Sequence, residues 1–263
     1  MKKHLKYIRK IFHLSLMEDM EYRTNFFVWI FVDGLWAVQD VIFFNALIAT
    51  TKTLGNWTQP QGLIVIGLFR LMVIPVWGWM FRNFSKIPKY ISQGKLDMLL
   101  TKPMDSQFLV SFTTFALTTI LSNFILGSLF IYTGIKALPY PIMPLNYLIF
   151  AWSIIPMFIL IYGAYFLTVA ASLYFDRLNN IHHIFPSFFD ATRYPQEIYN
   201  LVMQRIFVSI IPIAIMIVVP AQTLFGEIDV AQLVWLHILA IIFFIAGRFV
   251  WQKGLRHYSS ASS

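Results

Sequence analysis

The stretch KIPKYISQGKLDMLLTKPMDSQF, Lys86 to Phe108, is charged, bracketed by prolines and set between two long apolar runs. The apolar runs extend from about Gln61 to Phe81 and from about Phe108 to Ile135. Each has roughly the 20 apolar residues that a helix needs to cross a bilayer. The pattern therefore predicts two membrane spans joined by a loop that lies at the membrane surface.

The composition supports a membrane protein throughout. Of 263 residues, 58% are hydrophobic and only 12% are charged, and the mean hydropathy is +0.67. A soluble domain of this length could not bury so much apolar surface in one core. We therefore expect an all-α polytopic membrane protein. The chain has no cysteine, which excludes disulfides, thiolate nucleophiles and cysteine-based metal sites.

Three more runs have the length of a span, namely Thr24 to Ala49, Leu145 to Phe175 and Val230 to Trp251. Basic residues then set the topology. Six Lys and Arg residues precede the first span, five lie between the second and third, one follows the fourth and three lie at the C-terminal end. These 15 fall on one side if both termini are cytoplasmic, against Lys52 and Lys136 on the other. Both termini inside require an even number of crossings, so six spans are expected.

The region 178–226 must supply the extra crossing, and two arrangements are open. In the first, Ile206 to Thr223 is the fifth span and Leu178 to Tyr199 lies on the cytoplasmic surface. In the second, a short fifth span near Asn179 to Tyr194 is followed by a re-entrant segment in the outer leaflet, with breaks at Pro195, Pro212 and Pro220. Prolines are tolerated inside membrane segments where neighbouring helices satisfy the freed carbonyls. The second arrangement is favoured.

Two surface elements are expected outside the spans. Residues 1–23 form an amphipathic interfacial helix with a basic flank suited to anionic headgroups, and residues 252–263 form a cytoplasmic tail. In the loop 82–106, apolar residues at helical spacing stop at Gly94 and restart at Leu96, which predicts two short helical turns hinged at Gly94. This segment is expected either to receive force from a soluble subunit or to fill space under the bundle. The residues expected to contact such a subunit are Ile87, Tyr90, Ile91, Gly94, Leu96, Asp97, Leu99 and Leu100.

Ionisable residues inside spans are costly and need partners. At about 1.5 Å per residue, Asp40 and Arg70 both lie about 12 to 13 Å from the outer end. They are expected to pair, either to clamp the first two spans together or to line a substrate path. Asp33, Asn123 and His237 are weaker candidates for path or packing residues, and Asp190 is expected to pair with Arg193.

Several motifs carry a family resemblance. The stretch IxxGKLDMLLTKPM, Ile91 to Met104, resembles the coupling-helix region of ABC type-2 permeases. The chain also resembles the ABC-2 family transporter proteins of bacterial exporter operons over most of its length. The motifs are EDMEYRTNFFVW (Glu18 to Trp29), KPMDSQFLVSF (Lys102 to Phe112), RYPQEIY (Arg193 to Tyr199), IPIAIMIVVPAQTLFG (Ile211 to Gly226) and the terminal GLRHYSSASS (Gly254 to Ser263).

The resemblance implies one permease domain over residues 1–263, in a bacterial plasma membrane and surrounded by its lipids, that dimerises with itself or with a related permease. It also implies a separate P-loop ATPase, which binds ATP and Mg and docks on residues 82–106, and a re-entrant region that includes Arg193. The chain itself has no GxxxxGK[ST] motif, and we expect it to bind no cofactor, metal or nucleic acid. The expected substrate is amphipathic. A secondary transporter or a lipid-modifying enzyme remains the alternative.

Overall fold

The computed structural model describes residues 2–51, 57–174, 180–190, 193, 202 and 213–258, and side chains throughout these ranges except 47–51, 213 and 214. The protein is an all-α polytopic membrane protein. Among the described residues, five helices are long and apolar enough to cross a membrane. Their bounds as secondary structure are α2, Arg23–Thr51; α3, Gln59–Val73, with its continuation; α8, Leu117–Ala137; α9, Pro144–Ala170; and α13, Val230–His257.

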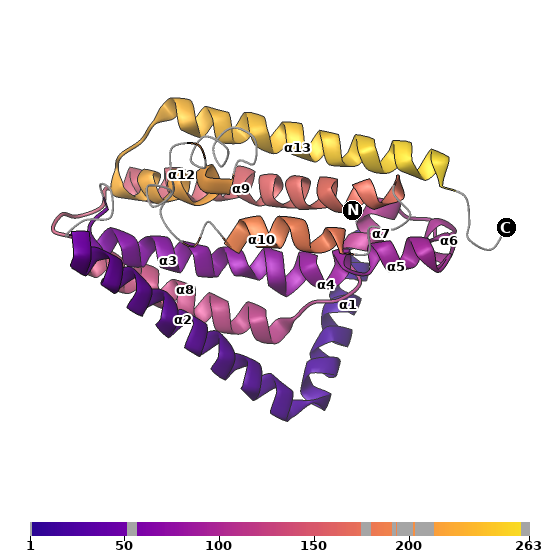
Figure 1. Cartoon of the computed structure of the whole chain (residues 1–263), viewed down its shortest axis with the longest axis horizontal. Helices are drawn as coiled ribbons and strands as arrows, with labels where there is room; N and C mark the ends of the chain where they lie inside the picture. The colour runs from indigo at the N-terminus through magenta and orange to yellow at the C-terminus, as the bar shows by residue number, and fades with distance from the viewer. Residues whose placement is uncertain are drawn as a thin grey trace.

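The long helices run side by side, and α1 (Lys2–Glu21) runs across one end of the bundle (Figure 1). The helices α3 and α8 pack closely together, as do α9 and α13, while α2 contacts α8 on the outside of the bundle. The short helices α5 (Ile87–Ser92), α6 (Leu96–Leu100) and α7 (Ser106–Ser111) lie at the same end as α1 (Figure 1). We call this the α1 end.

The second expected span is longer than the sequence indicates. After α3, a π-helical turn (η1, Ile74–Met80) begins beside Pro75 and leads directly into α4 (Phe81–Phe84). Because proline has no N–H to give to the helical ladder, a local change of helix type at this point is expected. The helix α5 then starts three residues beyond α4 and ends near Gly94, whose φ of 66° is left-handed. The two turns flanking Gly94 are thus the helices α5 and α6.

The third expected span, Phe108 to Ile135, is wrong at its start. The chain leaves the helix after α7 and resumes it at α8, so residues 112–116 are not α-helical. The side chain of Asn83 accepts hydrogen bonds from the backbone N–H groups of Thr113 (2.8 Å) and Thr114 (3.1 Å). Ser15 accepts one from the N–H of Phe115 at 2.9 Å. These distant side chains replace the helical partners, which the local sequence could not show.

At the other end, α9 ends in a 3₁₀ turn (η2, Ala171–Leu173), close to the expected end of the fourth span. The helix α13 extends to His257, so the first part of the expected tail, from residue 252, is helical. The helix α12 (Ile213–Phe225) has 13 residues, and at about 1.5 Å each it spans about 20 Å, less than the roughly 30 Å of a hydrocarbon core. On its own, α12 is too short to be the fifth span.

The remaining described part of region 178–226 is a 3₁₀ turn (η3, Ile181–His183) followed by α10 (Ile184–Asp190), together with the separate residues Arg193 and Val202. In Figure 1, α10 lies between α3 and α9. Much of the predicted fifth span and the breaks at Pro195 and Pro212 lie outside the described residues, so the choice between the two arrangements stays a prediction.

Glycines allow the two closest helix pairs to form. A Cβ atom on Gly67 of α3 would lie 2.8 Å from the carbonyl oxygen of Gly127 of α8, and one on Gly127 would lie 2.8 Å from the carbonyl oxygen of Gly67. A Cβ on Gly163 of α9 would lie 2.5 Å from the backbone nitrogen of Phe244 of α13. Small residues at such crossings let helix backbones approach closely in membranes.

Gly163→Val should therefore destabilise the bundle, because the added side chain meets backbone that cannot move aside. Overpacking of this kind costs about 1 to 3 kcal/mol or more, which should lower the midpoint of thermal unfolding in detergent. Gly34→Val is the matched control, since a Cβ at Gly34 meets nothing within 4 Å. An equal loss of thermal stability in both variants would show that the close approach of α9 and α13 at Gly163 is not the cause of the loss.

Candidate functional site

The helices α5 and α6 form a ledge, residues 87–100, on the α1 end of the bundle. Ile87 and Leu96 are fully buried in the core, and Tyr90, Ile91 and Leu99 are partly buried against it. The expectation that Ile87 and Leu96 contact a partner is therefore corrected: both side chains anchor the ledge to the bundle. The apolar side chains that the ledge exposes are Met98 (64% exposed) and Leu100 (39% exposed).

Met98 was not among the residues predicted from the sequence. It stands two positions from the buried Leu96, and residues two apart on a helix face different ways. A buried Leu96 implies that Met98 faces away from the bundle, but the sequence alone does not show that Leu96 is buried. Asp97 lies beside Tyr258, which directly follows α13. Burial, together with the nearby Asp97 carboxylate, raises the pKa of the Tyr258 hydroxyl.

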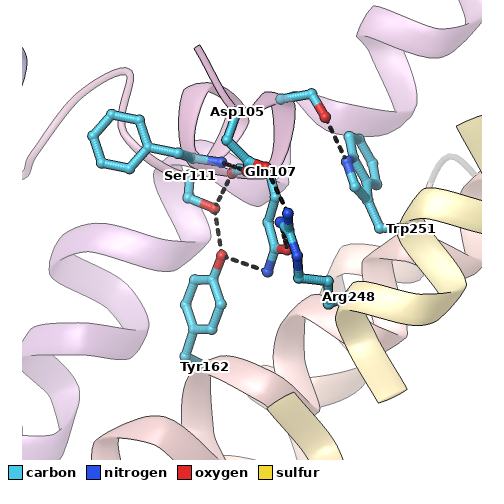
Figure 2. A network of polar contacts seen from close by, with 8 residues as sticks. Asp105, Gln107, Ser111, Tyr162, Arg248 and Trp251 are labelled. Atoms are coloured by element: carbon cyan, nitrogen blue, oxygen red, sulfur yellow. Dashed lines mark hydrogen bonds and ion pairs between the residues drawn. The ribbon is translucent and has the colours of Figure 1, made fainter. Parts of the chain in front are cut away.

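A network of polar contacts ties α7 to α9 and α13 (Figure 2). Arg248 of α13 donates to Asp105 at 2.8 Å and to the side-chain oxygen of Gln107 at 3.0 Å. Gln107 in turn donates to the Tyr162 hydroxyl of α9 at 3.1 Å. Figure 2 also shows Ser111 2.8 Å from the same hydroxyl and Trp251 donating to the Ser106 hydroxyl at 3.1 Å. We call these residues the α7 network.

Asp105 has two functions in the α7 network. It caps α7 by accepting the N–H of Phe108 at 3.0 Å, as aspartate does at many helix N-termini. The hydrogen bond from Arg248 lowers the pKa of Asp105 below its ordinary value. A lowered pKa stabilises the folded state above the ordinary carboxyl value, and this contribution is lost as the pH falls through the folded-state pKa. Because both side chains are 39% exposed, the ion pair itself adds little stability.

The non-helical residues 112–116 form a joint between α1, α4 and α8. Besides accepting from Thr113 and Thr114, Asn83 donates to the carbonyl oxygen of Thr114 at 2.9 Å. On the opposite side, Asp19 of α1 accepts the N–H of Thr118 at 3.2 Å. Thr118 lies in the first turn of α8, and Ala116, at the N-cap position, offers no side-chain cap. A residue of α1 therefore caps α8 across the joint.

The predicted Asp40–Arg70 pair is present inside the bundle, with both side chains buried and in direct contact. The structure adds two members to it. Arg193 lies 3.4 Å from the other carboxylate oxygen of Asp40, and Arg70 donates to the side-chain oxygen of Asn123 at 3.5 Å. The guanidinium of Arg193 also lies 5.4 Å from the ring centre of Trp36 and 5.2 Å from that of Phe69.

This charge cluster borders a cavity of about 720 Å³ between α2, α3, α8 and α10. Its lining combines arginines and carboxylates with aromatic side chains, among them Trp29, Trp36, Phe69 and Trp77. Asp33 is part of the wall and accepts a hydrogen bond from Ser122 of α8. A cavity of this volume with mixed lining is suited to a ligand that is part apolar and part polar.

The comparisons with known proteins match this architecture to one family. The family model described as ABC-2 family transporter protein matches residues 35–262. The chain belongs to the ABC-2 transporter family. No curated protein and no solved structure gives a significant match to it. The chain is thus a permease subunit of an ABC transporter, a multi-pass membrane component of a family that associates with an ABC ATPase.

The other residues predicted from the sequence lie outside the charge cluster or have packing roles. His237 contacts the carbonyl of Leu233 in its own helix at 2.8 Å and stacks on Trp152, an arrangement typical of packing. Pro220 lies inside α12. Among the described residues, Arg193 lies within ion-pair distance of Asp40 and interacts with Asp190 at longer range, so its direct partner is Asp40 and the expected Asp190–Arg193 interaction is secondary. Within the same residues, no group of three His, Asp or Glu could hold a metal ion.

Three groups share the buried charge, so single substitutions should differ in effect. Asp40→Ala leaves Arg70 and Arg193 without their carboxylate, and breaking a buried pair in this way costs about 3 to 5 kcal/mol. Arg70→Leu should be milder, because Arg193 still neutralises Asp40. We expect the amount of folded permease recovered from membranes to fall most for Asp40→Ala, with partial recovery in Asp40→Ala/Arg70→Leu. A double variant no better than Asp40→Ala would contradict a shared ion pair.

Proposed function

We propose that the permease is the membrane subunit of an ATP-driven exporter in a bacterial plasma membrane. It works with a second permease, identical or related, and with a separate P-loop ATPase that binds ATP and Mg. The observation that carries this proposal is the ledge at residues 87–100. It exposes Met98 and Leu100 at the end of the bundle, while Ile87 and Leu96 pack into the core.

Two sets of contacts connect the ledge to the helices of the bundle, and a movement of the ledge would be passed on through both. One leads through residues 101–105 into the α7 network, where Arg248 and Tyr162 connect it to α13 and α9. The other leads back through α4, where Asn83 holds the joint at 112–116. A push on the ledge by the ATPase would therefore tilt several helices together and would not merely bend a loop.

The proposed transport path is the cavity beside Asp40 and Arg70. It lies against α2, whose membrane-spanning part is mostly exposed in the single chain, so a second permease could close it from that side. Its aromatic walls and charged groups favour an amphipathic substrate. Both α1 and the end of α13 lie at the α1 end (Figure 1), as expected if both termini are cytoplasmic and the ledge faces the ATPase.

Met98→Glu tests the docking surface directly. A carboxylate on the exposed side of α6 should weaken the apolar contact with the ATPase, while the permease remains folded. In vesicles holding the permease and its ABC ATPase, we expect transport to fall at least about tenfold and the coupled ATP hydrolysis to fall with it. Met143→Glu is the control, because Met143 is similarly exposed (69%) in the α8–α9 connection away from the ledge. Normal transport by Met98→Glu would refute docking at the ledge.

The hinge can be tested separately at Gly94, whose left-handed φ of 66° suits glycine and, at lower frequency, asparagine. Proline fixes φ near −65° and cannot adopt this conformation. Gly94→Pro should reorient α6 and uncouple transport from hydrolysis, whereas Gly94→Asn should keep most activity. The ratio of substrate moved to ATP hydrolysed is the quantity to measure. An unchanged ratio in Gly94→Pro would make the ledge an ordinary loop.

A further inference from the structure

A second, smaller cavity of about 400 Å³ lies at the α1 end, between α1, α4 and the joint at 112–116. Its lining differs from that of the cavity beside Asp40 and Arg70, because polar and basic groups dominate it. The groups that matter are Arg82 and Lys86 with their positive charge, the hydroxyl groups of Ser85 and Thr113, and Glu18 as the one acidic member. We call it the elbow pocket.

The position of α1 places the elbow pocket at the membrane surface. The helix α1 runs across the ends of the spans (Figure 1) and exposes a series of large apolar side chains, as an interfacial helix does. These are Leu5, Phe12, Leu14, Leu16, Met17 and Met20. Leu14 also lines the pocket. The opening therefore lies at the depth where lipid headgroups meet the acyl chains.

The charge of the pocket favours an anion. Two cationic side chains face one carboxylate, and Lys86 forms no ion pair with any of the described residues within 4.0 Å. Its ammonium group donates to the Thr113 hydroxyl at 3.2 Å, which accounts for one of its three N–H groups. The other two are free to bind an oxygen anion in the pocket.

We propose that the elbow pocket binds the phosphodiester headgroup of an anionic glycerophospholipid from the leaflet that α1 covers. Lys86 and Arg82 neutralise the phosphate, the hydroxyl groups of Ser85 and Thr113 bind its oxygens, and Leu14 and Phe81 contact the start of the acyl chains. A lipid is favoured over a free phosphate because apolar side chains border the pocket at the interface. A bound headgroup would brace α1 against the joint that Ser15 and Asp19 already hold.

The test measures lipid binding to the purified full-length permease, stripped of lipid in a neutral detergent. Phosphatidylglycerol is titrated against phosphatidylcholine, and bound lipid is counted by native mass spectrometry. Wild-type protein should prefer phosphatidylglycerol, and Lys86→Gln should weaken its binding at least about fivefold. Lys89→Gln is the matched control, because Lys89 is exposed three residues away on α5 and loses the same charge.

Two further arms keep the result decisive. Arg82→Gln should also weaken binding and Lys86→Arg should preserve it, so a folding defect in one variant does not decide the outcome. Glycerol 3-phosphate and inorganic phosphate should not displace the lipid at millimolar concentration; displacement would assign the pocket to soluble phosphates and overturn the proposal. An equal loss of phosphatidylglycerol binding in Lys86→Gln and Lys89→Gln would overturn the proposal as well. So would unchanged binding in both Lys86→Gln and Arg82→Gln. Because the experiment measures lipid binding, its result for the elbow pocket does not depend on whether the permease transports a substrate.

Discussion

Backbone N–H and C=O groups that are buried away from water must find hydrogen-bond partners within the protein, and the rest of this structure depends on how that demand is met at residues 112–116, at the α1 end of the bundle. The chain leaves the helix there, and the freed N–H groups bond to Asn83 and Ser15. The carbonyl of Gly78 accepts the N–H of Ala116 at 2.7 Å, and the Trp79 indole donates to the carbonyl of Ser111 at 2.7 Å. The break thus ties the start of α8 to α1, η1 and α4.

The charged side chains inside the membrane must also find partners within the protein, and an unpaired charge there costs more free energy than an unpaired backbone group. Arg70 cannot remain unpaired at this depth, and Asp40 is its direct partner. Arg193 adds a second positive charge, which Asp40, the nearby carboxylate of Asp190 and the faces of Trp36 and Phe69 help to stabilise. The cluster holds α2, α3 and α8 together, and the region around Arg193 joins them on the side of the aromatic cavity. If the cavity is the transport path that we propose, the residues that clamp the helices together also form its edge.

Much of this architecture follows from sequence periodicity. Long apolar runs define the five spanning helices, alternation of charge and apolar residues defines α1, and equal depth brings Asp40 and Arg70 together. The sequence alone did not reveal the break after α7, because the residues 108–116 are apolar enough to continue a helix and the competing acceptors are about 30 and 100 positions away. Arg193 was assigned to its neighbour Asp190 for the same reason: spacing along one helix was visible, while a partner on another helix was not.

The ledge illustrates a further limit and its consequence. Helical spacing predicts the two turns, but it does not decide which of their side chains meet the bundle, so it does not separate the buried Ile87 and Leu96 from the exposed Met98. The α7 network links this ledge to α9 and α13 through the exposed ion pair Asp105–Arg248, which contributes under about 1 kcal/mol, and through the buried side chains of Gln107, Ser111 and Trp251. The bundle is held mainly by its glycine crossings and its large apolar core. The network contributes orientation, since its linked side chains fix how α7 lies against two helices at once. The residues proposed to transmit motion therefore overlap only in part with those that hold the fold, and Asn83 belongs to both groups.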